Sequence, residues 1–111
     1  MLNPAGWYLA TAQTDLRWGM DRLLLRVQSL AGDAAVGGAY VFRNRAGTRI
    51  KVMLVDATGV WLCTRRLHRG SFVWPRGDET VWAVSAQQFA WLCAGVDWQR
   101  LSSVKPPAVR L

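Results

Sequence analysis

The stretch of residues 39–67 constrains the fold more than any other part of the sequence, because apolar and basic residues alternate along it. Alternation with a period of two is typical of strands that have one buried face and one face in water. Two short polar segments, Asn44–Gly47 and Asp56–Gly59, interrupt the pattern and have the composition of tight turns. Short turns between consecutive strands favour antiparallel pairing, so this stretch predicts an antiparallel meander.

The same alternation places Ile50, Val52 and Leu54 on one face of a strand and Lys51 on the other. Gly70 interrupts the strand pattern before residues 71–75, where Pro75 either ends a strand or marks a sheet edge, since it has no amide hydrogen to donate. The main strands expected along the whole chain are residues 7–13, 39–44, 48–56, 60–67 and 80–84.

The first expected helix follows the first strand. Its apolar stripe, at helical spacing, consists of Leu16, Met20, Leu23, Leu24, Val27 and Leu30. Thr14 and Asp15 can cap its start, and Gly32 is a natural end. Gly19 weakens the first turn, so regular helix is expected only from about Trp18.

The second expected helix begins after Ser85, which is followed three residues later by Gln88 in the pattern of a capping box. Val84 and Phe89 stand at the positions of a hydrophobic staple, and Gly95 stands where a left-handed residue ends a helix. The order of elements is therefore β-α-β-β-β-β-α. This order predicts an α+β fold, an antiparallel sheet meander of about five strands with two helices.

A length of 111 residues, half of them hydrophobic, suits one domain with a real core. We expect this domain to span residues 1–98 and a mobile C-terminal tail to span residues 99–111, which lack periodicity.

No leader pattern or bilayer-length apolar run is present, so we expect a cytoplasmic protein with no membrane partner. Cys63 and Cys93 are interpreted as reduced and buried, with a disulfide between them as the alternative.

The net charge of +7 lies entirely between Arg43 and Arg76, where eight basic residues accompany one acid, Asp56. The segments on either side each sum to zero. Such a block on strands is typical of a surface that binds a phosphate backbone, and the simpler alternative is a solvated basic face without a special partner. The expected DNA contacts are Arg43, Arg45, Arg49, Lys51, Arg65, Arg66 and Arg69.

Aromatic residues interleave with these basic residues. Tyr40, Phe42 and Phe72 either stack on bases or pack in the core, as alternate aromatics on a strand usually do. The chain has seven tryptophans, most of which are expected to pack in the core. Trp74 and Trp98 are candidate contacts for a protein partner.

The residues for catalysis are sparse. One histidine, His68, and two distant cysteines do not provide the four ligands that zinc requires, and nothing places a nucleophile near the imidazole. Asp15, Asp56 and Asp97 each have an ordinary local role, as a cap, in a turn and at a bend, so they are not expected to form a metal site. No glycine-rich phosphate loop is present. We therefore expect no enzyme activity, cofactor, metal or small-molecule substrate.

Five motifs spread over roughly residues 7–98 carry a family resemblance. They are Thr14-Asp15-Leu16-Arg17 with Gly19; Tyr40-Val41-Phe42-Arg43-Asn44-Arg45 with Gly47; Ile50-Lys51-Val52 with Asp56; Arg66-Leu67-x-Arg69-Gly70-x-Phe72-Val73-Trp74-Pro75; and Gln88 with Gly95-Val96-Asp97-Trp98. The chain resembles the TnpB-like accessory protein, the second small product of bacterial insertion sequences of group sixty-six. That protein is distinct from the RNA-guided nuclease of the same label. The present chain departs from the pattern at Trp18, where a basic residue is common, and at Arg22, where a glycine is common.

The resemblance implies a role in transposition beside a separate, larger transposase, and it supplies no catalytic residues. Two hypotheses follow. The chain is an accessory factor that binds element ends or target DNA through its basic sheet face, or it is an adaptor that binds the transposase or another product of the same element. The third class, a nuclease, is disfavoured by the residues available.

Overall fold

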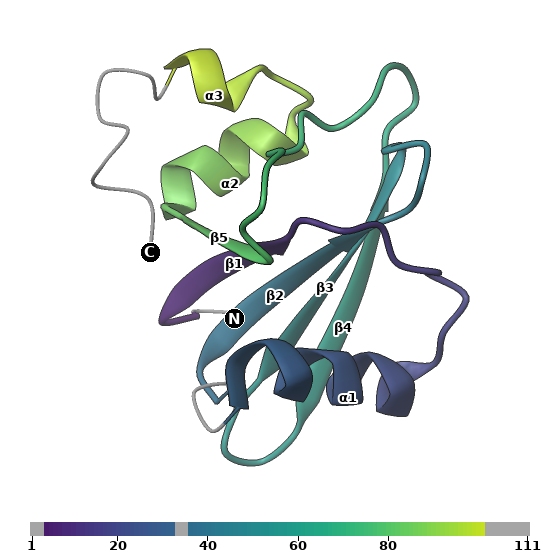
Figure 1. Ribbon diagram of the computed structural model, residues 1–111, viewed down its shortest axis with the longest axis vertical. Coiled ribbons are helices and arrows are strands. Elements are labelled where there is room, and N and C mark those ends of the chain that lie inside the picture. The colour runs from purple at the N-terminus through teal and green to yellow at the C-terminus, as the bar shows by residue number, and fades with distance from the viewer. Residues whose placement is uncertain (1–3, 33–35, 102–111) are drawn as a thin grey trace.

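The computed structural model describes residues 4–32 and 36–101, which contain five strands and three helices (Figure 1). In chain order these are β1 (Gly6–Ala10), α1 (Met20–Ala31), β2 (Gly38–Arg43), β3 (Arg49–Val55), β4 (Val60–Arg66), β5 (Val81–Val84), α2 (Ala86–Cys93) and α3 (Trp98–Leu101). The predicted α+β class and element order are confirmed, and α3 is a further single turn. This turn contains residues on both sides of the expected boundary at residue 98, and residues 102–111 of the expected tail lie outside the described residues.

The sheet has the strand order β4-β3-β2-β1-β5. As predicted, β2, β3 and β4 form an antiparallel meander, and β5 pairs antiparallel with β1. The pair β1 and β2 is parallel, which the prediction of a purely antiparallel meander did not include. Parallel neighbours need a long crossover connection, and the segment that contains α1 supplies it here.

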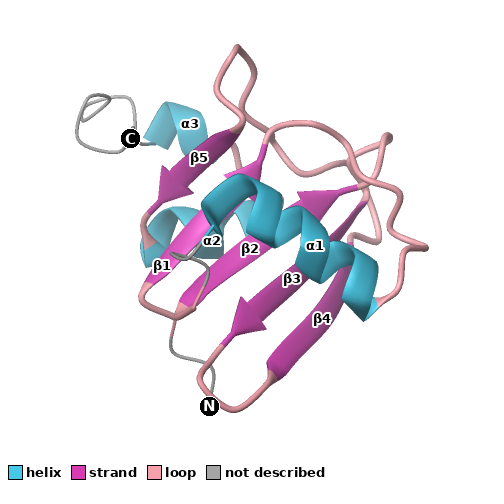
Figure 2. Cartoon of the chain, turned by 60° about the horizontal axis from the view of Figure 1, so that its bottom comes forward, coloured by secondary structure: helices cyan, strands magenta, loops and turns pink. Residues whose placement is uncertain are grey.

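Both faces of the sheet are covered, one by α1 and the other by α2, with α3 and part of the loop after β4 beside it (Figure 2). Ile50, Val52 and Leu54 share the α2 face, as predicted, and belong to its core cluster. Tyr40, Phe42 and Met53 lie on the α1 face with Leu23 and Val27 of the helix. The middle of the sheet therefore has no wet face, contrary to expectation, because β2 and β3 carry consecutive apolar residues, as strands buried on both faces do.

Helix α1 begins at Met20 and has Gly19 as its N-cap residue, without a side-chain cap. The predicted cap is confirmed for Asp15 in the turn that precedes the helix, where its side chain accepts from the Arg17 amide at 3.0 Å and from the Arg17 guanidinium, but neither Thr14 nor Asp15 caps the helix itself. The Arg22 guanidinium carbon lies 4.1 Å from the centre of the Trp18 ring, which is a cation–π contact. Trp18 and Arg22, two of the residues at which the chain departs from the pattern of the resemblance, thus contact each other.

Both ends of α2 follow the prediction. The Ser85 hydroxyl accepts from the Gln88 amide at 3.1 Å, and the Gln88 side chain accepts from the Ser85 amide at 2.7 Å. Gly95 has a φ of 76°, and the Val96 amide donates to the Trp91 carbonyl at 3.1 Å. The capping box and the left-handed C-terminal cap are confirmed.

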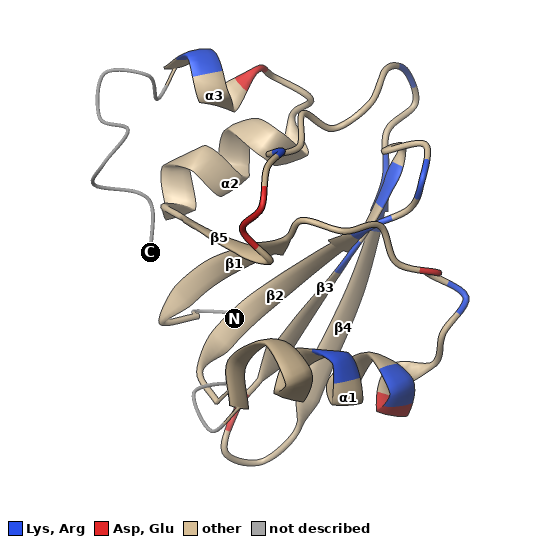
Figure 3. Ribbon diagram, in the orientation of Figure 1, with Lys and Arg blue, Asp and Glu red and all other residues tan. Residues whose placement is uncertain are grey.

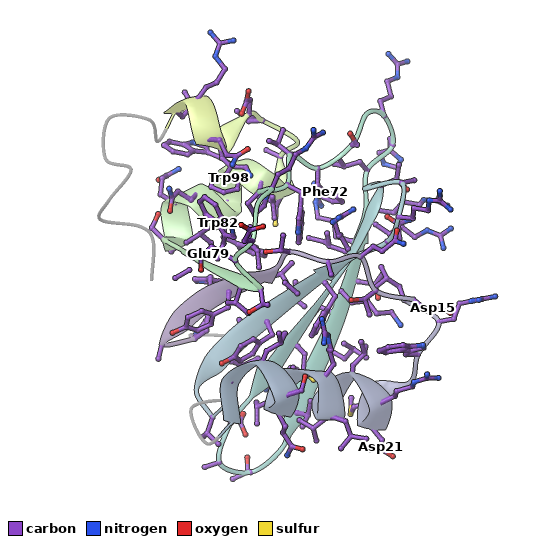
Figure 4. The ribbon with its side chains drawn as sticks, in the orientation of Figure 1. Asp15, Asp21, Phe72, Glu79, Trp82 and Trp98 are labelled. Carbon is purple, nitrogen blue, oxygen red and sulfur yellow. The ribbon has the colours of Figure 1, made fainter. Side chains whose placement is uncertain are left out.

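Residues 67–80 form a loop, so the strand left open at residues 71–75 does not form. The Phe72 amide donates to the Gly47 carbonyl at 2.7 Å, which ties this loop to the β2–β3 turn. Phe72 is 4% exposed and Trp98 is 2% exposed, and both lie on the α2 side of the sheet (Figure 4). Tyr40 and Phe42 are buried as well, so these three aromatic residues pack in the core and are not exposed platforms for bases.

Both cysteines are free thiols, and Cys93 is partly buried, which raises the pKa of its thiol. Cys63 is exposed, contrary to expectation, because it lies on the edge strand β4 beyond the cover of α2.

Within residues 4–32 and 36–101, no helix has both the length and the apolar character needed to cross a membrane.

Candidate nucleic-acid interface

Positive charge gathers at one end of the sheet, which we call the hairpin end (Figure 3). It comprises the β2–β3 turn at residues 44–48, the start of β3, the end of β4 and the loop that follows. The helices pack over the middle of the sheet, so this end stays open to solvent. Among the expected DNA contacts, the exposed residues are Arg45, Arg49, Arg65, Arg66 and Arg69, and the half-buried ones are Arg43 and Lys51.

A cleft of about 590 Å³, which we call the Lys51 cleft, lies on the α1 side of the hairpin end. The connection from β1 to α1 forms one wall and is held to β2 by a hydrogen bond from the Thr14 amide to the Arg43 carbonyl, at 2.9 Å. The β2–β3 turn forms another wall, where the Asn44 side chain accepts from two backbone amides. The lining residues are Gln13, Thr14, Asp15, Leu16, Arg17, Asn44, Arg45, Arg49, Lys51 and Thr64.

The strand register brings like charges together beside this cleft. Arg49 on β3 lies directly opposite Arg66 on β4, and Lys51 follows Arg49 on the same face. Like charges in this position destabilise a sheet. Within the described part of the chain, no carboxylate oxygen lies within 4.0 Å of a side-chain nitrogen of Arg45, Arg49, Lys51 or Arg66. A bound anion would relieve this repulsion.

One carboxylate does stand in the Lys51 cleft. Asp15 accepts from Arg17 through both side-chain oxygens, at 3.0 and 2.9 Å, and also from its backbone amide (Figure 4). The hydrogen bond from the Arg17 side chain is the main reason that the pKa of Asp15 falls to about 2, and its backbone hydrogen bond also contributes. Arg17 is therefore paired at neutral pH, unlike the other cations of the cleft.

Two of the expected DNA contacts also hold the fold together. The Arg43 guanidinium donates to the Thr11 carbonyl, at 3.1 and 3.3 Å, and so anchors the chain that leaves β1. Arg65 donates to the Cys93 carbonyl at 2.8 Å, at the C-terminal end of α2. A cation at this end of a helix is favourable because the last carbonyls carry partial negative charge.

A second cleft, of about 560 Å³, lies on the α2 side of the β2–β3 turn, and we call it the Trp74 cleft. Arg45 lines both clefts, so the turn separates them. The lining residues of the Trp74 cleft are Arg43, Arg45, Ala46, Gly47, Ser71, Phe72, Val73, Trp74, Pro75, Arg76 and Gln99. Arg69 lines neither cleft and lies in the exposed loop after β4.

The two candidate partner contacts are largely internal. The Trp98 indole donates to the Val73 carbonyl at 2.7 Å and is buried. The Trp74 indole donates to the Ala10 carbonyl at 2.8 Å and is half-buried, with part of its surface in the Trp74 cleft. Little of the Trp98 side chain is available to a protein partner.

The other acidic residues that the structure describes line neither of the two clefts. Asp56 accepts from the amides of Thr58 and Gly59, both at 2.8 Å, and these bonds lower the pKa of its carboxyl. Asp97 precedes α3 and Glu79 lies in the loop before β5. Among the described residues, no three His, Cys, Asp or Glu side chains are grouped so as to hold a metal ion.

Sequence reasoning did not include Arg17, Arg76 and Gln99 among the site residues, although they line the clefts. Arg17 stands in a motif of the family resemblance, which was the signal available for it. Nothing in the local pattern shows that the chain before α1 returns to the β2–β3 turn, because that return follows from the parallel pairing of β1 with β2.

Comparison with known proteins identifies the family. The family described as "IS66 Orf2 like protein" matches residues 5–103. The chain is 42% identical over 93 residues to the uncharacterized protein y4hO of Sinorhizobium fredii, an alignment that covers 83% of this chain and 81% of that protein. It is 34% identical over 94 residues to the uncharacterized protein y4jC of the same organism, with 84% and 80% covered. No solved structure matches the chain. The chain therefore belongs to the IS66 Orf2-like family, accessory proteins of IS66 transposition.

Proposed function

We propose that this chain is a non-catalytic accessory factor that binds duplex DNA, at element ends or at the target, through its hairpin end. It would act in the bacterial cytoplasm beside the transposase and other products of the same element. The basic surface in this proposal is the end of the sheet around the Lys51 cleft, in place of the flat sheet face expected from the sequence.

The observation that carries the proposal is the group of cations without carboxylate partners around the Lys51 cleft. Arg49 and Arg66 stand directly opposite each other, and Lys51 and Arg45 line the same cleft. A fold that keeps like charges adjacent loses stability, and a phosphate backbone compensates for the repulsion when it binds. The Asn44 side chain accepts from the amides of Thr48 and Arg49, and so holds the backbone of Arg49 in place.

The test is a titration of purified protein on duplexes with element-end sequence and with random sequence, over a range of salt concentrations. If Arg45, Arg49, Lys51 and Arg66 each neutralise one phosphate, the logarithm of the binding constant falls against the logarithm of salt with a slope of about −4. Changing Arg49→Ala together with Lys51→Ala should reduce the slope to about −2. Arg100→Ala, on α3, is the matched control and should leave the slope unchanged.

Undetectable binding at low salt, or a slope unaffected by the double change, would exclude DNA binding at the hairpin end. Equal weakening on both sequences would indicate phosphate contacts, whereas a loss confined to element ends would indicate an arginine that reads a base edge. Incubation with magnesium or manganese should give no strand cleavage, and cleavage abolished by Asp56→Ala or Asp97→Ala would contradict the non-catalytic role.

The second candidate, an adaptor for the transposase, is favoured by a different observation. The strand β4 lies at an edge of the sheet, and its Trp61 is 54% exposed. Open edge strands pair readily with a strand of another chain, and exposed tryptophans are frequent binding hot spots. Trp61→Ala should weaken capture of the transposase and leave the salt slope on DNA unchanged if β4 is the adaptor surface.

A further inference from the structure

The Trp74 cleft differs in chemistry from the Lys51 cleft, although the two share Arg45 and have similar volumes. The lining of the Lys51 cleft contains no aromatic residue, whereas that of the Trp74 cleft includes Trp74 and the buried Phe72, together with Val73 and Pro75. The segment that supplies these residues is the Phe72-Val73-Trp74-Pro75 motif. The proposed duplex contacts make no use of it.

The Trp74 ring is held in a fixed position. The Trp74 indole donates to the Ala10 carbonyl at 2.8 Å, so one edge of the ring is anchored in the fold. Trp74 is half-buried and is one of the residues that line the cleft. Bases stack on such rings with little regard for sequence, because every base has a π face.

Three cations stand around the same cleft. Arg43, Arg45 and Arg76 line it, and within the described residues no carboxylate oxygen lies within 4.0 Å of their side-chain nitrogens. The two hydrogen bonds from Arg43 to the Thr11 carbonyl fix the direction of its guanidinium. The Gln99 amide, which can both donate and accept, completes the lining.

Each of these groups binds one part of a nucleotide. An aromatic residue stacks on the base, the cations bind the phosphate, and the amide forms hydrogen bonds with the base edge. The volume of about 560 Å³ lies within the range of small-ligand sites. A paired base cannot enter, because both of its faces are covered in the duplex and its extrusion costs energy. We propose that the Trp74 cleft takes an unpaired nucleotide of DNA, so that the chain prefers duplex with a single-stranded extension to blunt duplex.

This inference rests on the proposed binding of DNA at the hairpin end. In that arrangement the Lys51 cleft holds the backbone of the duplex, and the strand crosses the β2–β3 turn at Arg45. Its first unpaired base then lies against Trp74. The position of Arg45 on both clefts is what connects the two sites.

The test compares the affinity of the full chain for a blunt duplex, the same duplex with a short thymidine tail at its 3′ or 5′ end, and the same duplex with an abasic tail of equal length. The abasic tail adds the same phosphates without bases. We expect at least one thymidine tail to raise affinity about 5- to 150-fold, the range for stacking of one base on an aromatic side chain. The abasic tail should give only the small gain due to its charge.

Variants assign the gain to the cleft. Trp74→Leu and Arg76→Ala should each reduce the preference for the tail and change affinity for blunt duplex less than twofold, while Trp74→Phe should keep most of the preference. Arg76 is exposed, so its change leaves the core intact even if the Trp74 variants lose stability. Lys51→Ala is the matched control: it should weaken binding to blunt and tailed duplexes equally.

Equal affinity for blunt and thymidine-tailed duplexes, or an equal gain from the abasic tail, would overturn the inference while leaving duplex binding in place. A preference that survives both Trp74→Leu and Arg76→Ala would also overturn it. Failure to bind any of these DNAs would overturn the proposed function and this inference together.

Discussion

At the scale of single residues, the charge of the hairpin end is moderated by one carboxylate. Asp15 pairs with Arg17 on the wall of the Lys51 cleft, and both side chains are accessible, at 39% and 91% exposure respectively. Exposed ion pairs contribute little to stability, so the effect of this pair is mainly to neutralise one cation in the cleft.

Asp15→Asn should therefore strengthen DNA binding, because it removes a negative charge from the cleft and frees Arg17 for phosphate. The expected gain is about two- to fivefold at low salt, with the salt slope steeper by about one. Titrations of the variant and the parent chain on one duplex measure both quantities. Weaker binding would show that Arg17 needs its carboxylate partner to hold its position.

The pH dependence of the same pair has a definite sign. The pKa of Asp15 falls to about 2 from its ordinary value of 3.8, so the stabilising effect of the pair is complete above about pH 3.8 and is lost as pH falls through about 2. Arg17→Ala should return the carboxyl pKa toward its ordinary value. Titration of the Asp15 carboxyl followed by NMR measures this, and a midpoint that stays near 2 would contradict the assignment to Arg17.

Gly95 is a residue whose backbone conformation can be tested directly. Its φ of 76° is in the left-handed region, where a side chain is strained even though the nearest atom of Leu67 would lie at an ordinary 3.5 Å from a new Cβ. Gly95→Ala should lower the free energy of unfolding by about 1–2 kcal/mol in urea denaturation. Gly59→Ala is the matched control, since that glycine has no positive φ and no neighbour within 4 Å; equal losses would contradict the assignment.

At the scale of elements, α2 is the helix whose start and end follow most fully from its local sequence. Its first turn is closed by the capping box, its last turn by Gly95, and its end also accepts a hydrogen bond from Arg65. The capping box and the Gly95 cap join residues that are close together in sequence. The Arg65 bond joins the helix to the edge strand β4, which is distant in the chain. The helix therefore begins and ends where local chemistry directs it, and Arg65 fixes where it packs.

Ser85→Ala should lower the free energy of unfolding by about 1 kcal/mol, because two backbone amides at the start of α2 lose or weaken their partners. Ser29→Ala, on α1, is the comparison: its hydroxyl bonds only to the Arg26 carbonyl within the same helix, and alanine is a better helix former. Urea denaturation of both variants gives the difference. A loss at Ser85 no larger than at Ser29 would show that the cap is not stabilising.

At the scale of the whole molecule, Trp98 joins parts of the chain that are far apart in sequence. It follows α2, lies in the core on the α2 face of the sheet, and bonds to Val73 in the loop after β4. Trp98→Ala should lower the free energy of unfolding by about 3–5 kcal/mol, the usual cost of removing a buried aromatic side chain. Trp61→Ala, with 54% of the side chain exposed, should cost much less; comparable losses would mean that Trp98 is not buried in solution.

Much of the fold was predictable because local chemistry directs it. The turns at Asn44 and Asp56, the apolar stripe of α1 and both ends of α2 depend on residues close together in sequence, so their patterns could be read directly. The order of elements and the shared face of Ile50, Val52 and Leu54 follow from the same local patterns.

The parallel pairing of β1 with β2 and the covered second face of the sheet depended on tertiary structure. No local pattern states which strand a segment will join after a helix, and that choice is made by burying α1 on one face and α2 on the other. The candidate site shows the same division. Sequence alone determined how much charge the chain carries and in which residues it lies. The fold alone decided that Arg17 reaches the cleft, that Arg43 and Arg65 bond to backbone carbonyls, and that the Trp74 motif lines a cleft beside them, because these contacts join residues distant in the chain.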